Sequence, residues 1–228
     1  MDRQEILNKI HKGLIVSCQA LDEEPLHSSY IMSRMAYAAK LGGAVGIRAN
    51  TIADIRAIRT IVNLPIIGII KQRYPGSDVV ITPTRREFDA LLKEQVEIIA
   101  TDATDRIRPD GITIRELFKE VRKDYPDQLF MADCASYEDA VRAFELGFDL
   151  VGTTLNGYTK EARQTPPPNF GFMRKLVETL NCPIIAEGGI FSPEQLRQAM
   201  DQGVFACVVG SAITRPLEIT RRYVAALK

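Results

Sequence analysis

Eight short apolar runs alternate along this chain with longer segments of helical periodicity. The runs lie at residues 13–18, 44–47, 65–70, 97–100, 129–132, 149–152, 183–186 and 205–209. Parallel strands that are covered on both faces read in this way, because neither face retains the polar alternation of a half-exposed strand. The pattern predicts repeated βα units that share one parallel sheet.

The segments between the runs carry the marks of helix ends. We predict helices over residues 28–41, 51–62, 84–93, 113–125, 136–146, 169–180, 192–201 and 215–228. Ser192, Pro193 and Gln195 combine an N-cap candidate, a proline at the first helical position and a capping-box side chain. Gly42 and Gly147 follow two of the predicted helices, where glycine commonly ends a helix.

Eight such units in 228 residues come to roughly 28 residues each, which suits a compact (β/α)₈ barrel. An open doubly wound sheet usually has fewer strands, and the GxGxxG motif of dinucleotide-binding folds is absent from the sequence. No linker or shift in composition divides the chain. We therefore predict an α/β protein, a (β/α)₈ TIM barrel, with a single domain over residues 1–228.

Charge and hydropathy exclude several classes of partner. Lys plus Arg and Asp plus Glu each number 29, so the formal net charge is zero and no basic stretch favours nucleic acid or an anionic membrane. The longest apolar run, 66–70, is far shorter than the ~20 residues that span a bilayer, and the amino terminus lacks the apolar region of a signal peptide. We expect a cytoplasmic protein with no nucleic-acid or membrane partner.

Cysteine and histidine usage argues against disulfide and metal frameworks. The four cysteines are scattered without a CxxC pair, and each lies in or beside an apolar run, where a free thiol behaves as a small hydrophobe. His11 and His27 lie near no other group of ligands, and we interpret both as solvated residues of helix ends and loops. We predict no disulfide and no metal site.

Polar residues close the apolar runs. In a (β/α)₈ barrel the chemistry lies at the carboxyl ends of the strands, so these positions are candidate site residues. They are Gln19, Arg48, Lys71, Asp102, Asp133, Thr153, Glu187 and Gly210. A solvated strand end or a rim ion pair explains any one of them alone. Together they place two cations, three carboxylates and an amide around one mouth, which stability alone does not require.

The last two units carry the signature of an anion site. Gly188 and Gly189 follow the seventh run, and Gly210 and Ser211 follow the eighth. Glycines let main-chain N–H groups approach an anion, and phosphate sites in such barrels are often built from these two loops. Arg215 adds a bidentate donor. Tight turns would also explain the glycines, but their occurrence at both places favours a small phosphorylated metabolite as the substrate.

Seven motifs together resemble one enzyme family. They are GIIK (68–71), ITPT (81–84), ATDAT (100–104), ADC (132–134), VGTTL (151–155), AEG (186–188) and VGSAITRP (209–216). Over residues 13–216 the chain resembles the N-acetylmannosamine-6-phosphate 2-epimerases of sialic-acid catabolism. The resemblance implies conversion of that sugar phosphate to N-acetylglucosamine 6-phosphate. One departure is KQRYP at 71–75 in place of KRDYP, which retains Lys71 but gives no support to an acidic residue just after it.

The resemblance also implies functional positions, namely Gln19, Arg48, Lys71, Asp133, Glu187 and Arg215. Inverting C2 of a 2-acetamido sugar requires an open-chain aldehyde, removal of the C2 proton and its return on the other face. Lys71 is the predicted base, and only its neutral form can accept a proton. Its reference pKa near 10.4 must therefore be lowered, by burial and by Arg48. Glu187 is the predicted acid, acting at C2 or in ring opening.

The remaining candidates are expected to bind the substrate. Arg48 or Gln19 would donate a hydrogen bond to the enolate oxygen or to the acetamide, and Asp133 would orient Lys71 or bind a sugar hydroxyl. Thr153 completes the predicted substrate-binding set, with Gly188, Gly189, Gly210, Ser211 and Arg215 for the phosphate. No step calls for a metal or an organic cofactor.

Three other functions stay open on the residues alone. A Schiff-base aldolase would use Lys71 as a nucleophile, and a phosphoribosyl- or thiamin-phosphate-type barrel enzyme would share the phosphate loops without the pairing of Lys71 with Glu187. A non-catalytic phosphosugar-binding protein would bind without turnover. A homodimer is also left open, and the long segment 153–168 is a candidate mobile cover over the site.

Overall fold

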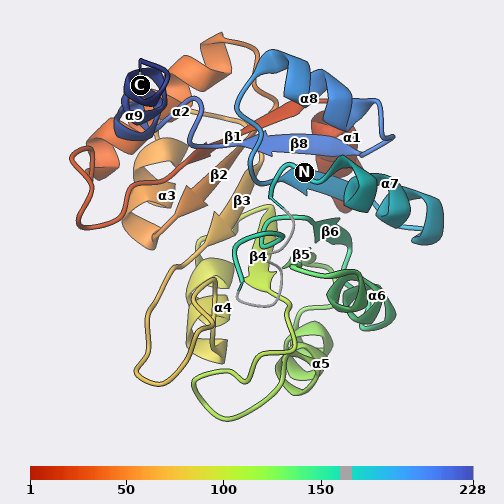
Figure 1. The fold of residues 1–228 in the computed structure, drawn as a ribbon. Helices are drawn as coiled ribbons and strands as arrows, with labels where there is room; N and C mark the ends of the chain where they lie inside the picture. The colour runs from red at the N-terminus through yellow and green to blue at the C-terminus, as the bar shows by residue number, and fades with distance from the viewer. Residues whose placement is uncertain (160–165, 228) are drawn as a thin grey trace.

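A computed structural model describes residues 1–159 and 166–227 of the protein and shows a barrel (Figure 1). Within those residues the strands are β1 Leu14–Cys18, β2 Gly46–Asn50, β3 Ile66–Ile69, β4 Ile98–Asp102, β5 Leu129–Asp133, β6 Leu150–Gly152, β7 Ile184–Glu187 and β8 Ala206–Val209. They pair in chain order as parallel neighbours, and β1 pairs with β8 to close the sheet. The predicted (β/α)₈ barrel is confirmed.

A helix follows each strand. These helices are α2 Ser29–Leu41, α3 Ile52–Arg59, α4 Arg85–Lys93, α5 Ile114–Asp124, α6 Tyr137–Glu145, α7 Phe170–Thr179, α8 Pro193–Met200 and α9 Pro216–Ala225. Each begins and ends within three residues of a predicted helix. Capping boxes begin α5 at Thr113 and α6 at Ser136, and Ser192 begins α8 with a proline in its first turn.

A further helix, α1 Arg3–Ile10, precedes the first strand and was not predicted. Asp2 and Glu5 form the capping box that begins it. Ile6 and Ile10 are buried among the side chains of the barrel interior, so α1 closes the amino-terminal end of the barrel. The other helices lie between or after the apolar runs, where the βα alternation predicts them, whereas α1 precedes the first run and that alternation gives no signal for it.

Alternate residues of each strand face the barrel interior. Ile67 and Ile69 of β3 belong to the interior cluster, as do Leu129 and Met131 of β5, whereas Phe130 packs in the outer core beneath the helices. A polar residue that continues the inward alternation at the carboxyl end of a strand therefore points into the mouth of the barrel. This alternation determines which side chains form the site.

Strand β2 ends later than predicted. The apolar run at 44–47 suggested that Arg48 follows the strand, but β2 continues to Asn50 and Arg48 lies within it. Ile47 and Ala49 belong to the outer core, so Arg48 and Asn50 occupy inward positions. The apolar run ends early because these two inward positions carry polar side chains.

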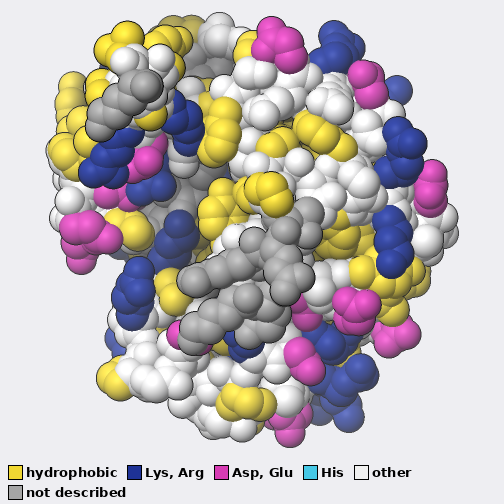
Figure 2. Space-filling view, viewed as in Figure 1, with side chains coloured by type: hydrophobic (Ala, Val, Ile, Leu, Met, Phe, Trp, Pro, Cys, Tyr) yellow, Lys and Arg dark blue, Asp and Glu magenta, His cyan; other side chains and the backbone are white. Residues whose placement is uncertain are grey.

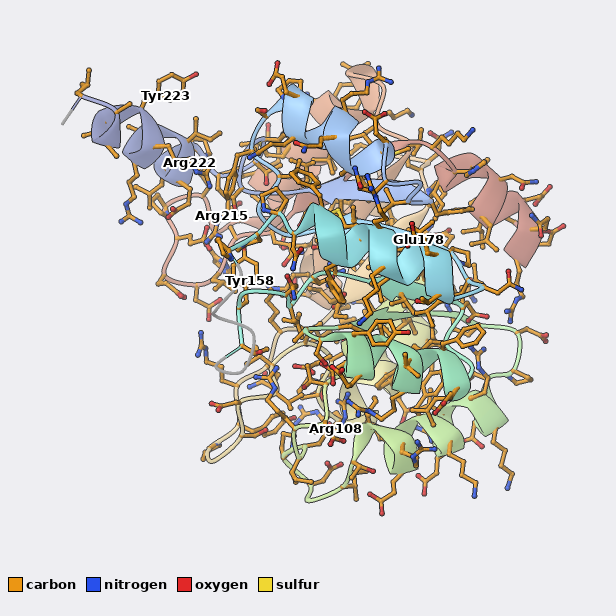
Figure 3. All side chains as sticks on the ribbon, turned by 45° about the vertical axis from the view of Figure 1, so that its right-hand side comes forward. Arg108, Tyr158, Glu178, Arg215, Arg222 and Tyr223 are labelled. Atoms are coloured by element: carbon orange, nitrogen blue, oxygen red, sulfur yellow. The ribbon has the colours of Figure 1, made fainter. Side chains whose placement is uncertain are left out.

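Helix α9 differs from the other helices because none of its residues is buried. It projects away from the barrel at the upper left of Figure 3. Tyr223 on this helix is 76% exposed, and Leu227 just beyond it is 87% exposed, so these apolar side chains lack a covering layer. Leu217 and Val224 are exposed as well.

The surface carries charges of both signs. Figure 2 shows lysine and arginine side chains interspersed with acidic ones on the visible face. Over the described residues, no helix has the length and apolar character needed to cross a bilayer. The four cysteines are free, and three of them are buried.

Candidate active site

A cavity of about 320 Å³ opens at the carboxyl ends of the strands, a volume typical of a small-ligand site. Eight predicted site residues line it: Gln19, Lys71, Glu187, Gly188, Gly189, Gly210, Ser211 and Arg215. Arg48, Asp133 and Thr153 are buried behind the lining residues. Glu24, Thr154 and Tyr158 also line the cavity and were not predicted.

Lys71 continues the inward face of β3 beyond the end of the strand. It follows Ile67 and Ile69 at two-residue spacing, and its main-chain N–H donates to Asn50 Oδ1 at 2.8 Å. An antiparallel bridge pairs Lys71 with Ile81, where the intervening loop returns to the barrel. These contacts hold the main chain of Lys71 at the cavity.

The amine of Lys71 faces the cavity unpaired. Among the residues that the structure describes, it has no hydrogen-bond or ion-pair partner. Burial lowers its pKa to about 8, with a further lowering from Arg48 and an opposing effect of Glu187. At pH 7.5 about a quarter of such an amine is neutral, against about one in a thousand for an ordinary lysine. A general base requires a lowered pKa of this kind, because only the neutral amine can accept a proton.

Glu187 is tied to the barrel wall through one carboxylate oxygen. Its Oε2 accepts a hydrogen bond from Arg48 Nη1 at 2.8 Å and lies 3.2 Å from Thr154 Oγ1. Burial raises the pKa of Glu187 to about 7, and Arg48 opposes that rise while Asp133 adds to it. The carboxyl group is therefore partly protonated at neutral pH, as an acid in this position must be.

Arg48 and Asp133 support Glu187 instead of facing the cavity. Arg48 is 1% exposed, and its two terminal nitrogens donate to Asp133 at 3.0 and 2.6 Å. The sequence suggested that Arg48 donates a hydrogen bond to an enolate oxygen. In the structure its guanidinium does not line the cavity and is not placed to do so. Asp133 also accepts from the Thr154 hydroxyl at 2.6 Å, and it forms neither a hydrogen bond nor an ion pair with Lys71. It therefore does not orient that amine directly.

Thr154, not the predicted Thr153, lines the cavity. Leu150 faces the interior, so Gly152 and Thr154 share the inward face while Thr153 turns outward. The Thr153 hydroxyl donates to the Glu187 carbonyl at 2.8 Å and accepts from the Glu187 N–H at 3.0 Å. Counting two-residue steps from Leu150 would have selected Thr154.

Gln19 presents an unpaired acceptor. Its side-chain NH₂ donates to Ser17 Oγ at 2.8 Å, while its carbonyl oxygen is buried without a hydrogen-bond partner in the described part of the chain. A buried acceptor without a donor is costly, so the position favours a ligand that offers an N–H or O–H group. Gln19 is thus placed to accept a hydrogen bond, whereas the sequence suggested a donor.

Main-chain N–H groups of the loops after β7 and β8 also line the cavity. Gly188 and Gly189 have φ of +106° and +70°, which L side chains rarely adopt, and a Cβ on Gly189 would lie 2.5 Å from the Pro167 carbonyl carbon. Within the described residues, the N–H groups of Gly188, Gly210 and Ser211 have no acceptor. Free N–H groups on two neighbouring loops are donors of the kind that bind an anion.

Arg215 borders the cavity and is already paired with an acid. Its guanidinium forms a bidentate ion pair with Glu24, with Arg215 Nε 2.9 Å from Glu24 Oε2. Figure 3 shows Arg215 near Tyr158, from the segment that follows β6. Glu24 lies outside the strand ends, so sequence inspection could not associate it with the site.

Asp102 and Arg73 lie outside the cavity lining. Asp102 binds Thr104 and Arg106 and does not line the cavity. Arg73, at the departure from the family motif, is exposed. The candidate cover at 153–168 includes residues 160–165, which lie outside those that the structure describes, so that prediction stays untested.

Comparisons with known proteins give the family. A family profile described as "Putative N-acetylmannosamine-6-phosphate epimerase" matches residues 32–228. A protein of Caldanaerobacter subterraneus subsp. tengcongensis named "Putative N-acetylmannosamine-6-phosphate 2-epimerase" is 48% identical over 226 residues, which cover 99% of this chain and 95% of the relative. The chain belongs to the N-acetylmannosamine-6-phosphate 2-epimerase family. A family member of the same name from Borreliella afzelii is 52% identical over 96% of each chain.

Solved structures agree with the family and the fold. The N-acetylmannosamine-6-phosphate 2-epimerase of Clostridium perfringens superposes with a TM-score of 0.92 at 48% identity, covering 97% of this chain and 96% of that one. A thiamine phosphate pyrophosphorylase of Pyrococcus furiosus superposes with a TM-score of 0.59 at 18% identity over 97% of this chain and 98% of that one. The second likeness shows a shared barrel alone.

Proposed function

We propose that this epimerase family member interconverts N-acetylmannosamine 6-phosphate and N-acetylglucosamine 6-phosphate by inverting C2. The observation that carries the proposal is an unpaired, partly neutral Lys71 amine that lines one cavity with the partly protonated Glu187 carboxyl. The same cavity offers free N–H groups from the loops after β7 and β8, where a phosphate would bind.

The chemistry requires a base and an acid in this arrangement. Opening the sugar ring exposes an aldehyde at C1, which makes the C2 proton acidic because the resulting charge is delocalised as an enolate. The neutral Lys71 amine takes the C2 proton. The Glu187 carboxyl supplies a proton to the opposite face of C2 or assists ring opening. No step in this proposal uses a metal or an organic cofactor.

Other side chains of the cavity select the substrate. The buried Gln19 oxygen would accept the acetamide N–H or a sugar hydroxyl, which supplies its missing donor. A sugar without a donor at that position would leave the oxygen unpaired, so Gln19 favours a substrate that presents an N–H or O–H group there. Arg48, Asp133 and Thr153 act behind the cavity by holding Glu187 in place.

A direct assay tests the proposed function. The purified chain is mixed with N-acetylmannosamine 6-phosphate, and the anomeric proton signals of the two epimers are followed by NMR. We expect approach to one equilibrium mixture from either epimer. Unphosphorylated N-acetylmannosamine is the matched control, and its turnover should be far slower because the anion site stays empty. Absence of any conversion of the phosphorylated sugar contradicts the proposal.

Arg215→Met is expected to raise KM about 10- to 100-fold, the equivalent of losing about 1.5–3 kcal/mol from a charged hydrogen bond to the phosphate. The turnover number kcat should change less, because the phosphate is remote from C2. Steady-state kinetics measure both constants. Arg221→Met is the control, since Arg221 pairs with Glu218 on α9 away from the cavity. An unchanged KM would remove Arg215 from the phosphate site.

We also propose that residues 1–228 form one domain. Strand β1 pairs with β8, so the first and last strands belong to the same closed sheet. No cut between them leaves a complete barrel on either side. Unfolding in denaturant should therefore show one transition by both fluorescence and circular dichroism.

The uncovered face of α9 supports a homodimer as a further proposal. Leu217, Tyr223, Val224 and Leu227 are exposed on or just beyond this helix, and a twofold pairing would place the same apolar face on both partners. We expect a dimer by light scattering coupled to size-exclusion chromatography. The Tyr223→Asp, Leu227→Asp double variant should be a monomer. A wild-type monomer at micromolar concentration contradicts this proposal.

A further inference from the structure

Thr154 lies between the two carboxylates of the buried cluster. Its Oγ1 is 2.6 Å from Asp133 Oδ1 and 3.2 Å from Glu187 Oε2. Arg48 Nη1 lies 3.0 and 2.8 Å from the same two oxygens. One hydroxyl and one guanidinium nitrogen thus bridge the same pair of oxygen atoms.

The net charge of the cluster of Arg48, Asp133 and Glu187 favours the binding of one proton. A single guanidinium, that of Arg48, faces two carboxylates, so the ionised cluster carries one excess negative charge in a buried site. Two carboxylates that share a buried site do not both ionise readily. Asp133 receives both terminal nitrogens of Arg48, and this favours placing the proton on Glu187.

The contacts also distinguish the two oxygens of Glu187. Oε2 accepts from Arg48 and contacts the Thr154 hydroxyl, whereas Oε1 has no partner among the described residues. An oxygen that already faces an N–H donor is a poor site for another hydrogen. When Glu187 is neutral, its proton therefore belongs on Oε1. Glu187 is one of the residues that line the cavity.

We propose that Thr154 is a positioning residue for Glu187: its hydroxyl, together with Arg48, holds Oε2 against the wall and leaves the transferable proton on Oε1. When Oε1 gives its proton to the substrate, the O–H bond breaks and Glu187 becomes a carboxylate. Thr154 then donates to the ionised group and stabilises it. This inference rests on the proposed function, because the direction of transfer assumes a substrate that needs a proton.

Every charged group near Glu187 bears on its titration. Arg48 from β2 and Asp133 from β5 contact the cluster directly, while Lys71 after β3 lies across the cavity. Tyr158, in the segment that follows β6, interacts electrostatically with Glu187. Replacing Thr154 leaves these groups in the chain but also removes the 2.6 Å contact of its hydroxyl with Asp133, so a change in the titration reports the contacts of the hydroxyl with both carboxylates.

The test compares Thr154→Val, which removes the hydroxyl at nearly constant shape, with Thr154→Ser, which retains it. In the wild type, kcat/KM should follow a bell with apparent pKa values near 7 and 8. Thr154→Val should lower kcat about tenfold and raise the lower apparent pKa by about one unit, because the ionised carboxyl loses a donor. Thr154→Ser should restore both quantities to within about threefold and 0.3 unit.

Two controls separate the possible outcomes. Thr153→Val removes a hydroxyl that contacts only the main chain of Glu187, so it should not move the lower apparent pKa. Thr154→Ala gives a second variant if the valine does not fold, as judged by circular dichroism. An unmoved pH profile in the valine and alanine variants, or a serine variant that behaves like valine, overturns the inference. A wild type that does not epimerise the sugar overturns the proposed function itself.

Discussion

Lys71→Met is expected to lower kcat about 10⁴-fold, the upper range for loss of a general base. Methionine keeps the length and the apolar stem of the side chain but cannot accept a proton from C2. No neighbouring group takes over, because Gln72 and Arg73 are exposed and the Glu187 carboxyl is tied to Arg48. Conversion of the two epimers followed by NMR measures the loss.

The same variant should still bind the substrate. The proposed phosphate contacts lie on the loops after β7 and β8, so the dissociation constant should change by less than about threefold, under 1 kcal/mol. Calorimetric titration with the sugar phosphate measures it. Exchange of the C2 proton retained at the wild-type rate would show that another residue is the base. Borohydride with substrate and the wild type should trap no adduct on Lys71, whereas a Schiff-base aldolase would be trapped.

Arg48→Met is expected to lower the free energy of unfolding by about 3–5 kcal/mol at pH 8. The guanidinium is 1% exposed and is the partner of two buried carboxylates. Without it, Asp133 and Glu187 face each other with only the Thr154 hydroxyl between them. Urea unfolding followed by circular dichroism measures the change. Arg221→Met, which removes an exposed ion pair with Glu218, is the control and should change stability little.

The loss in Arg48→Met should depend on pH with a defined sign. Burial already raises the pKa of Glu187 to about 7 in the wild type, and removing Arg48 raises it further. A carboxyl whose folded pKa exceeds its unfolded value of about 4.3 binds more protons when folded, so stability falls as pH rises between the two values. The deficit should therefore be smaller at pH 5 than at pH 8. A deficit no larger than that of Arg221→Met at both pH values would contradict this account of the cluster.

The barrel was predictable from the sequence because its strands are short, apolar and regularly spaced. Errors arose where a strand carries polar residues on its inward face, as in β2, where Arg48 and Asn50 extend the strand beyond its apolar run. Helix α1 was missed because it precedes the first apolar run and so falls outside the βα alternation, although Asp2 and Glu5 mark its start. Capping residues of this kind indicate where a helix begins, but they do not by themselves show that a helix is present.

The sequence predicted those site residues that lie at the ends of strands or in the loops directly after them. The inward faces of β3 and β7 end at Lys71 and Glu187, and the glycine loops come directly after β7 and β8. All of them line one cavity. Thr153 closes the sixth apolar run, but the alternation from Leu150 places Thr154 on the inward face instead. The pairing of Glu24 with Arg215 joins positions 191 residues apart, and only the folded chain shows it.

Incorporation of deuterium at C2 tests the central claim most directly. N-acetylmannosamine 6-phosphate is incubated with the wild type in D₂O, and the C2 proton of substrate and product is followed by NMR and mass spectrometry. The account predicts that the N-acetylglucosamine 6-phosphate formed carries one deuterium, located at C2, because the proton taken by Lys71 exchanges with solvent or is replaced from Glu187. Product that retains its original C2 hydrogen throughout would contradict proton abstraction by a solvent-exchangeable base.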